Sequence, residues 1–367
     1  MGGGWRGGPY ARAHGPRRTA LMDSRERVLG AIRRTGVDRA PCNFRAEPPT
    51  LRRLYEHLGH GDHERLLDDF GVDIRTVDAV PPAEADMGGY TQNFWGERYV
   101  YRTNRWGRYR DDLPGALSGA ATLKELKGFA WPKVSQMDYS KVAAQCAADD
   151  GRAILYGFGD IFTRPSMVRG FENFLLDMHE RPEFVHCLQE IFTGFYEEEY
   201  ARAWKECGGK VDVFFVMGDL SSQSGPLFSP AFFDEFVGPY MRRMADRIHE
   251  LGALFMFHTC GDTYGLIDRM VGCGVDAIDP IQRTSDLMGP ESLKARFGDR
   301  VAFHGGIDVQ TTLPYGSEEE VRAEVRRYVD AFGKGGGYIA ASSHLLQHDT
   351  PPENIVAMYD EIGRSRF

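Results

Sequence analysis

Short apolar segments alternate with amphipathic segments over most of this chain. The apolar segments predict strands at 153–159, 211–217, 254–258, 276–279, 301–304 and 338–341. The amphipathic segments predict helices within 165–206, then at 229–251, 264–272, 290–297, 317–333 and 352–363. This alternation is typical of a parallel sheet buried on both faces. We therefore predict an α/β fold, a (β/α)8 TIM barrel, with an open doubly wound sheet as the alternative.

The N-terminal part predicts additions to this barrel. Asp23 or Ser24 can cap a helix over 25–34, and a strand-like segment follows at 42–45. Helices are expected within 50–70. Residues 71–132 are rich in Gly, Pro, Tyr and Trp and predict hairpins and loops that decorate the barrel. We expect one barrel domain over 23–367.

The first 22 residues differ in composition from the rest. They are rich in Gly, Arg and Ala and contain no acidic residue. We predict a disordered tail over 1–22 with Met22 as the natural start; a mitochondrial-type presequence is the alternative. No apolar run approaches the roughly 20 residues that a membrane-spanning helix needs.

Charge and cysteine content limit the classes of function that we expect for this chain. The 367 residues carry a formal net charge of −9, which argues against a surface for nucleic acid or anionic membranes. The six cysteines are scattered without a disulfide pattern, so we expect reduced thiols in a cytoplasmic protein. The acidic run Glu197–Glu199 is expected on a solvated helix face.

Polar side chains follow five of the predicted strands. In a barrel, the C-terminal strand ends meet at one mouth, where active sites lie. Taken singly, each of these residues could be a capped turn or a hydrogen-bonded core residue. Together they predict one polar cavity, formed by Asp219, His258, Cys260, Asp279, His304, Asp308 and His344.

The segment His-Thr-Cys-Gly-Asp at 258–262 contains a metal-ligand pattern. Two residues apart at a strand end, His258 and Cys260 point the same way and can bind one metal. His344 is the candidate third ligand, and Asp219 could fill the fourth position or hydrogen-bond the water there. A His2Cys set with an open position suits catalytic zinc. Near His344, the alternatives are Ser342, Ser343 and His348.

Several segments in this order resemble the uroporphyrinogen decarboxylase-like superfamily over roughly 24–363. They are Arg-Glu-Arg-Val-Leu at 25–29, Arg-Gly-Phe-Glu-Asn-Phe-Leu at 169–175, Gly-Asp-Leu at 218–220, Phe-Ser-Pro at 228–230, His-Thr-Cys-Gly-Asp-Thr at 258–263, Gly-Gly-Ile-Asp at 305–308 and His-Leu-Leu-Gln-His-Asp-Thr-Pro-Pro at 344–352. The resemblance implies a (β/α)8 barrel.

Two branches of that superfamily bear on function. The decarboxylases carry Cys-Met-Arg-Gln-Ala-Gly-Arg, whose arginines hold substrate carboxylates; the matching stretch at 42–46 keeps Arg45 and loses the second arginine. The zinc-dependent methyltransferases, which serve a corrinoid protein, carry His-x-Cys-Gly and a Cys six residues before Thr-Pro. His258 and Cys260 match the first feature, but His344 stands in place of that Cys. The decarboxylases also have a His at this position.

These patterns lead to three hypotheses. The first is a zinc methyltransferase or demethylase with zinc on His258, Cys260 and His344 and a corrinoid on a partner protein. Asp219 and His344 would be catalytic in it, and the chain could form a homodimer. The second is a metal-free decarboxylase, and the third is a non-catalytic barrel that binds a small ligand. The residues predicted to contact the substrate are Arg45, Asp279, His304 and Asp308.

Overall fold

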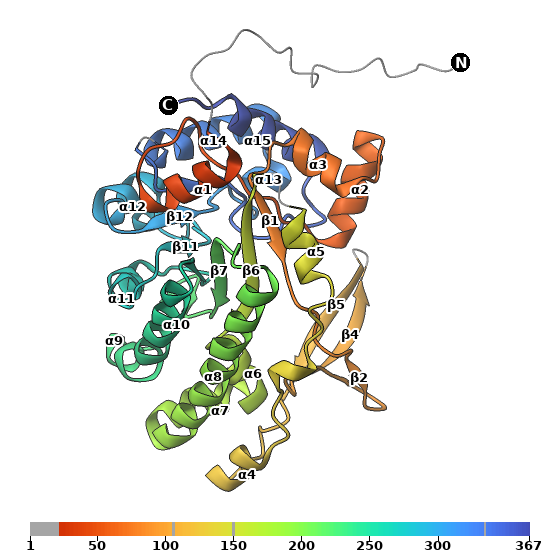
Figure 1. The fold of residues 1–367 in the computed structure, drawn as a ribbon, viewed down its shortest axis with the longest axis vertical. Coiled ribbons are helices and arrows are strands. Elements are labelled where there is room, and N and C mark those ends of the chain that lie inside the picture. Colours follow the sequence, from red (N-terminus) through yellow and green to blue (C-terminus); the bar gives the residue numbers. More distant parts are fainter. Residues whose placement is uncertain (1–21, 105–106, 149–150, 334) are drawn as a thin grey trace.

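A computed structural model describes residues 22–104, 107–148, 151–333 and 335–367. The predicted tail 1–22 therefore lies outside the described residues, except for Met22. Figure 1 shows parallel strands with helices packed around them. No helix in the described ranges has the length and apolar character that crossing a membrane requires.

The central sheet has seven parallel strands in the order β1-β6-β7-β10-β11-β12-β13. Their bounds are β1 Ile74–Val77, β6 Ala153–Asp160, β7 Val213–Met217, β10 Leu254–His258, β11 Ala277–Asp279, β12 Ala302–His304 and β13 Tyr338–Ile339. Within this sheet the strands lie side by side in the order in which the chain forms them, as successive βαβ units place them. The predicted strands from 153 onward are confirmed.

An eighth segment closes the sheet into a barrel. The Asn43 N–H donates to Ala340 O at 3.1 Å, just after β13, and the Asp73 N–H donates to Cys42 O at 3.0 Å, just before β1. The strand-like segment expected at 42–45 thus lies between the last and first strands. The predicted (β/α)8 barrel is confirmed, and the open doubly wound sheet is not observed.

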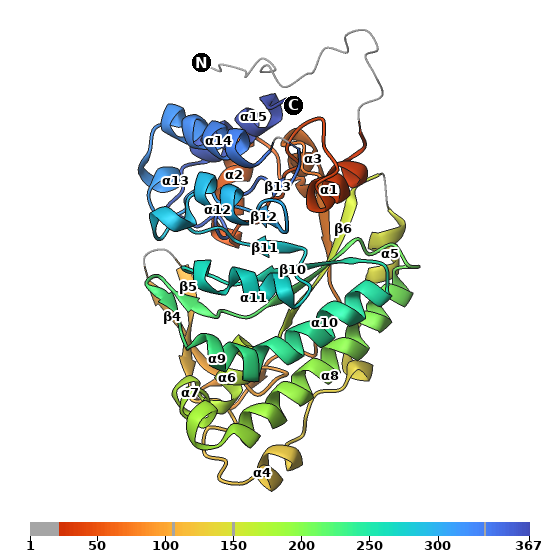
Figure 2. The same cartoon turned by 90° about the vertical axis from the view of Figure 1, so that its left-hand side faces the viewer.

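Most of the described helices cover the outside of the barrel, and the first helix of the chain lies at its N-terminal end. They are α1 Ser24–Arg33, α2 Pro48–Leu58, α3 His63–Asp69, α4 Leu123–Gly128, α5 Val142–Ala147, α6 Thr163–Arg169, α7 Phe171–Glu180, α8 Pro182–Glu206, α9 Pro230–Phe232, α10 Gly238–Glu250, α11 Ile267–Gly272, α12 Pro290–Phe297, α13 Thr312–Tyr315, α14 Glu318–Phe332 and α15 Pro352–Arg364. Figure 2 shows α8 and α10 side by side along the sheet. Asp23 caps α1 through a capping box with Glu26.

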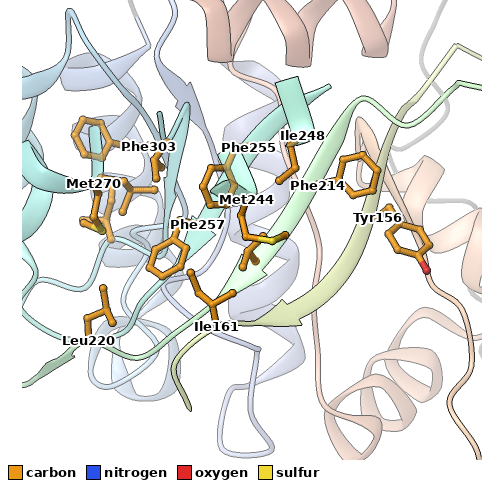
Figure 3. Close-up of a cluster of buried hydrophobic side chains, with 14 of the residues drawn as sticks. Tyr156, Ile161, Phe214, Leu220, Met244, Ile248, Phe255, Phe257, Met270 and Phe303 are labelled. Atoms are coloured by element: carbon orange, nitrogen blue, oxygen red, sulfur yellow. The ribbon is translucent and has the colours of Figure 1, made fainter. Parts of the chain in front are cut away.

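Alternate strand residues divide the core into two parts. Phe255 and Phe257 of β10 point outward to Met244 and Ile248 of α10, as Figure 3 shows. The intervening Met256 points into the barrel. The interior also contains Val28, Ala31 and Ile32 of α1, so this helix packs against the inside of the barrel from its N-terminal end. The C-terminal mouth is left for polar residues.

The decoration after β1 contains a four-stranded antiparallel sheet. Its strands are β2 Ala85–Asp86, β3 Thr91–Gln92, β4 Arg98–Asn104 and β5 Gly107–Leu113. Figure 1 shows β4 and β5 set off from the parallel strands. Hairpins were predicted for 71–132, but that range also contains β1, which pairs with β6 in the barrel. The decoration therefore begins only after Val77.

Two predictions about single residues are wrong. Cys146 and Cys207 form a disulfide across a sequence separation of 61, whereas all six cysteines were expected to be reduced. Spacing gave no signal, because α5 and the end of α8 meet only in the folded chain. Glu199 was expected on a solvated face but is 4% exposed. It lies on the side of α8 that packs against the barrel, and its carboxylate accepts a hydrogen bond from the Tyr156 hydroxyl.

Candidate active site at the barrel mouth

Three of the predicted residues meet at the C-terminal mouth. His258 is the last residue of β10, Cys260 follows two residues later, and His344 comes from the loop after β13. One ligand atom from each lies within 4.8 Å of the others. Gly261 has a φ of +87°, and a Cβ there would lie 2.4 Å from Ser222 O. A glycine is therefore required for the chain to turn directly after Cys260.

The donor atoms suit zinc. His258 Nε2 lies 3.4 Å from Cys260 Sγ. A tetrahedral zinc with ordinary Zn–N and Zn–S bonds would separate such atoms by about 3.6 Å. The His258 and His344 ring centroids are 6.1 Å apart. Two imidazoles and one thiolate leave one coordination position for substrate or water, as in catalytic zinc sites.

Asp279 orients His258 from below. Its Oδ2 is 2.5 Å from His258 Nδ1, which fixes the tautomer with its free Nε2 lone pair toward Cys260. Arg45 Nη2 donates to both carboxylate oxygens at 2.9 and 3.0 Å. Burial alone would raise the pKa of Asp279, but Arg45 and the two histidines hold it well below its ordinary value. Asp279 therefore remains a carboxylate although it is fully buried.

His304 completes this buried network. Its Nδ1 is 2.5 Å from Asp279 Oδ1, and its Nε2 is 3.1 Å from Asn43 Nδ2. An amide donor at Nε2 leaves the only ring proton on Nδ1, so His304 is neutral. Desolvation also lowers the pKa of His304, which likewise favours the neutral ring. Asp279 and His304 are both 0% exposed, so they lie beneath the mouth and not on the substrate-facing surface where the sequence placed them.

Asp219 lies beside the thiol at the rim. Its Oδ1 accepts the Cys260 backbone N–H at 2.9 Å and lies 3.8 Å from His258 Nε2. The Asp219 side chain is 42% exposed, so it reaches both the cluster and solvent. Its own N–H donates to the Thr163 hydroxyl at 2.8 Å. This position allows Asp219 to move a proton between a bound molecule and water.

Arg45 and Asp308, both predicted to contact the substrate, make contacts within the protein. The Arg45 guanidinium is engaged with Asp279 and lies 5.1 Å from the Phe215 ring centroid. Asp308 lies away from the three-residue cluster, and its carboxylate accepts the N–H groups of Gln310 and Thr311 at 2.8 and 3.0 Å. It lines a neighbouring cavity. Its contacts hold the loop after β12.

The alternatives to His344 point elsewhere. The Ser342 hydroxyl donates to His344 O, and the Ser343 hydroxyl accepts the Val309 N–H at 3.2 Å. His348 Nδ1 lies 3.7 Å from Glu47 Oε2. Within the described chain, His344 is thus the residue of this loop that joins His258 and Cys260. Burial lowers the pKa of His344, which favours the neutral imidazole that a metal requires.

A cavity of about 660 Å³ opens above Cys260 and His344. Its polar wall includes four glutamines that the sequence did not single out, Gln223, Gln282, Gln310 and Gln347. Gln282 Oε1 also accepts the Gly261 N–H at 2.6 Å. No lysine or arginine lines this cavity in the part of the chain that the structure describes. The wall suits a neutral polar molecule better than a polyanion, because carboxylates require cationic partners.

Comparisons with known proteins agree on the fold and differ in the activities they name. The family model "Uroporphyrinogen decarboxylase (URO-D)" matches residues 119–364. The uroporphyrinogen decarboxylase of Bordetella petrii is 27% identical over 227 residues, 58% of this chain and 59% of that protein. That of Syntrophotalea carbinolica is 27% identical over 227 residues, 59% of this chain and 61% of its own length. The chain thus spans about 60% of these curated relatives.

A solved structure matches almost the whole chain. The methyltransferase from Methanosarcina mazei superposes with a TM-score of 0.66 at 18% identity, covering 93% of this chain and 98% of that one. At this identity the likeness establishes the fold alone.

Proposed function

The chain belongs to the uroporphyrinogen decarboxylase (URO-D) family, and from the residues at its barrel mouth we propose that it is a zinc-dependent methyltransferase or demethylase. The observation that carries this proposal is the His258–Cys260–His344 cluster, with its donor atoms within 4.8 Å of one another. The methyl donor would be a small molecule such as a methyl ether. The acceptor would be a corrinoid on a separate protein, as the resemblance to the methyltransferase branch implies.

The surrounding residues have distinct roles in this proposal. Zinc held by His258, Cys260 and His344 would supply Lewis acidity at the donor heteroatom. Asp279 contacts His258 Nδ1 and thereby directs Nε2 at the cluster. Asp219 lies where it can give a proton to the departing oxygen. The glutamine wall offers hydrogen bonds that orient a neutral substrate.

A metal-free decarboxylase is the second candidate, and the names of the relatives favour it. Arg45 would then hold a carboxylate. That role conflicts with its contacts, since Arg45 Nη2 donates to both oxygens of the buried Asp279. The second arginine of the decarboxylase segment is also absent from 42–46. The cation-free wall above Cys260 supports the methyltransferase.

Metal content tests the proposal. We expect near-stoichiometric zinc by mass spectrometry in the wild-type protein and a large loss in Cys260→Ala. Cys273→Ala is the matched control and should leave zinc unchanged, because this buried thiol contacts Gly238 O and is not part of the group formed by His258, Cys260 and His344. A metal-free, folded wild-type protein would refute the zinc site. Zinc-loaded protein should then demethylate methoxy compounds in the presence of cob(I)alamin, whose oxidation state is followed by absorbance.

A further inference from the structure

A second cavity of about 340 Å³ lies against β1 and β6. It shares no lining residue with the cavity above Cys260. Its walls include five aromatic side chains, those of Phe94, Trp95, Tyr156, Phe195 and Tyr196. None of the roles proposed above uses this cavity.

Three carboxyl groups line this cavity, those of Asp78, Glu84 and Glu199. Glu84 is exposed, and its Oε2 accepts the Tyr101 hydroxyl at 3.0 Å. Asp78 directly follows β1 and accepts the Gly157 N–H at 3.2 Å. Glu199 projects from α8, and its Oε1 accepts the Tyr156 hydroxyl. Across the described ranges, neither Asp78 nor Glu199 forms an ion pair with Lys, Arg or His. Asp78 is partly buried, Glu199 is buried, and the charge of Asp78 raises the pKa of Glu199. Buried carboxyl groups are costly unless a positive charge or a proton compensates them.

The one arginine that lines the cavity already has counter-charges. Arg164 Nε lies 3.3 Å from Glu97 Oε1, and its Nη1 donates to the Tyr196 hydroxyl. Asp160, 4% exposed, also attracts this guanidinium. The charge of Arg164 is therefore compensated by its own neighbours, and in the described residues no cation compensates the three carboxyl groups of the cavity wall.

From this arrangement we infer that the β1–β6 cavity binds an organic ammonium group, such as that of a methylated amine. The carboxylates of Asp78 and Glu199 would supply charge attraction, and the aromatic rings would face the alkylated nitrogen, as aromatic cages do for quaternary ammonium ions. A bare metal ion fits less well. Among the described residues, the group that could hold a metal is His258, Cys260 and His344, and it includes neither carboxyl. The inference goes beyond the proposed function and does not depend on zinc.

Proton release should accompany binding. Burial raises the pKa of Asp78 to about 7 and that of Glu199 to about 8. At neutral pH, protons therefore compensate part of the buried charge. A cation favours the ionised carboxylates and displaces these protons, so its affinity should rise as pH rises from 6 to 9.

Calorimetry with choline and its uncharged isostere 3,3-dimethylbutan-1-ol tests the charge requirement. We expect choline to bind the wild-type protein at least 10-fold more tightly than the isostere at pH 8.5. At pH 7, titrations in buffers with different ionisation enthalpies should show proton release. Absent choline binding, or equal affinity for the two compounds, would overturn the inference.

Variants test the location. Glu199→Gln should lower choline affinity at least 10-fold, because Gln keeps the hydrogen bond to Tyr156 and removes the charge. Glu198→Gln is the matched control, because Glu198 is the exposed neighbour of Glu199 and does not line the cavity. Equal effects of the two substitutions would contradict the assignment.

The Cys260→Ala variant should bind choline as the wild-type protein does. This control separates failure of the ammonium inference from failure of the zinc proposal. If Glu199→Gln does not fold, the affinities of the wild-type protein for choline and for 3,3-dimethylbutan-1-ol still test whether the cavity requires a positive charge.

Discussion

Replacing Asp279 by Ala should damage both stability and metal binding. The substitution removes the carboxylate that contacts Arg45, His258 and His304 in a site with 0% exposure. Removing one partner of a buried ion pair costs about 3–5 kcal/mol, because the other charge is left buried and uncompensated. Losing a carboxylate that orients a metal-binding histidine lowers metal affinity about 10–100-fold.

The opposite end of the same strand provides the control. Asp276 Oδ2 lies 2.7 Å from His249 Nε2 and accepts the Phe255 N–H at 2.8 Å, but its side chain is 28% exposed. Asp276→Ala should therefore cost only about 1 kcal/mol, since water screens this pair. It should leave zinc affinity unchanged.

Urea denaturation and competition with a chelator of known zinc affinity measure the two effects. We expect Asp279→Ala to lose several kcal/mol of unfolding free energy and at least 10-fold in zinc affinity, whereas Asp276→Ala changes neither strongly. Equal stability losses in the two variants would refute the reasoning about the buried network. Unchanged zinc affinity in Asp279→Ala would refute the role given to the His258 tautomer.

Three further predictions concern other parts of the molecule. The pKa of Glu199 is raised to about 8, so the folded protein holds a proton that the unfolded chain has released. This contribution to stability is lost as pH rises from about 4.5 to about 8. Glu199→Gln should remove this loss, which is on the order of 5 kcal/mol, and the urea midpoint should then depend less on pH. Parallel pH curves for variant and wild type would contradict this. Cys146→Ser should lower the unfolding free energy by about 4 kcal/mol, the chain-entropy value for a loop of this length, and reductant should abolish the difference; a difference that persists in reductant would point to packing instead. His344→Cys should keep zinc bound, because thiolate is also a zinc ligand, whereas His344→Ala should release it to a chelator. Equal zinc retention in these two variants would exclude His344 as a ligand.

The barrel itself was predictable because its strands are short, apolar and separated by amphipathic helices. β1 was missed for a local reason. Its residues Arg75 and Thr76 interrupt the apolar run, and the hairpins that follow dominate the composition of 71–132. Missing β1 also hid Asp78, which follows its strand in the same way as Asp219 follows β7.

The candidate site was predicted in part. The two-residue spacing of His258 and Cys260 at a strand end dictates that they point the same way, and the structure brings both to His344. Position at a strand end does not determine depth, so the full burial of Asp279 and His304 could not be foreseen. Burial of Glu199 depends on which face of α8 packs inward. The disulfide depends on contacts between distant helices, which spacing along the chain does not encode.

X-ray absorption at the zinc edge tests the central claim most directly, because it counts the ligands of the bound metal. For the wild-type protein, we predict one sulfur at about 2.3 Å together with nitrogen ligands at about 2.0–2.1 Å, and no sulfur in any zinc retained by Cys260→Ala. A zinc environment without sulfur in the wild-type protein would contradict the assignment of His258, Cys260 and His344 as the metal site.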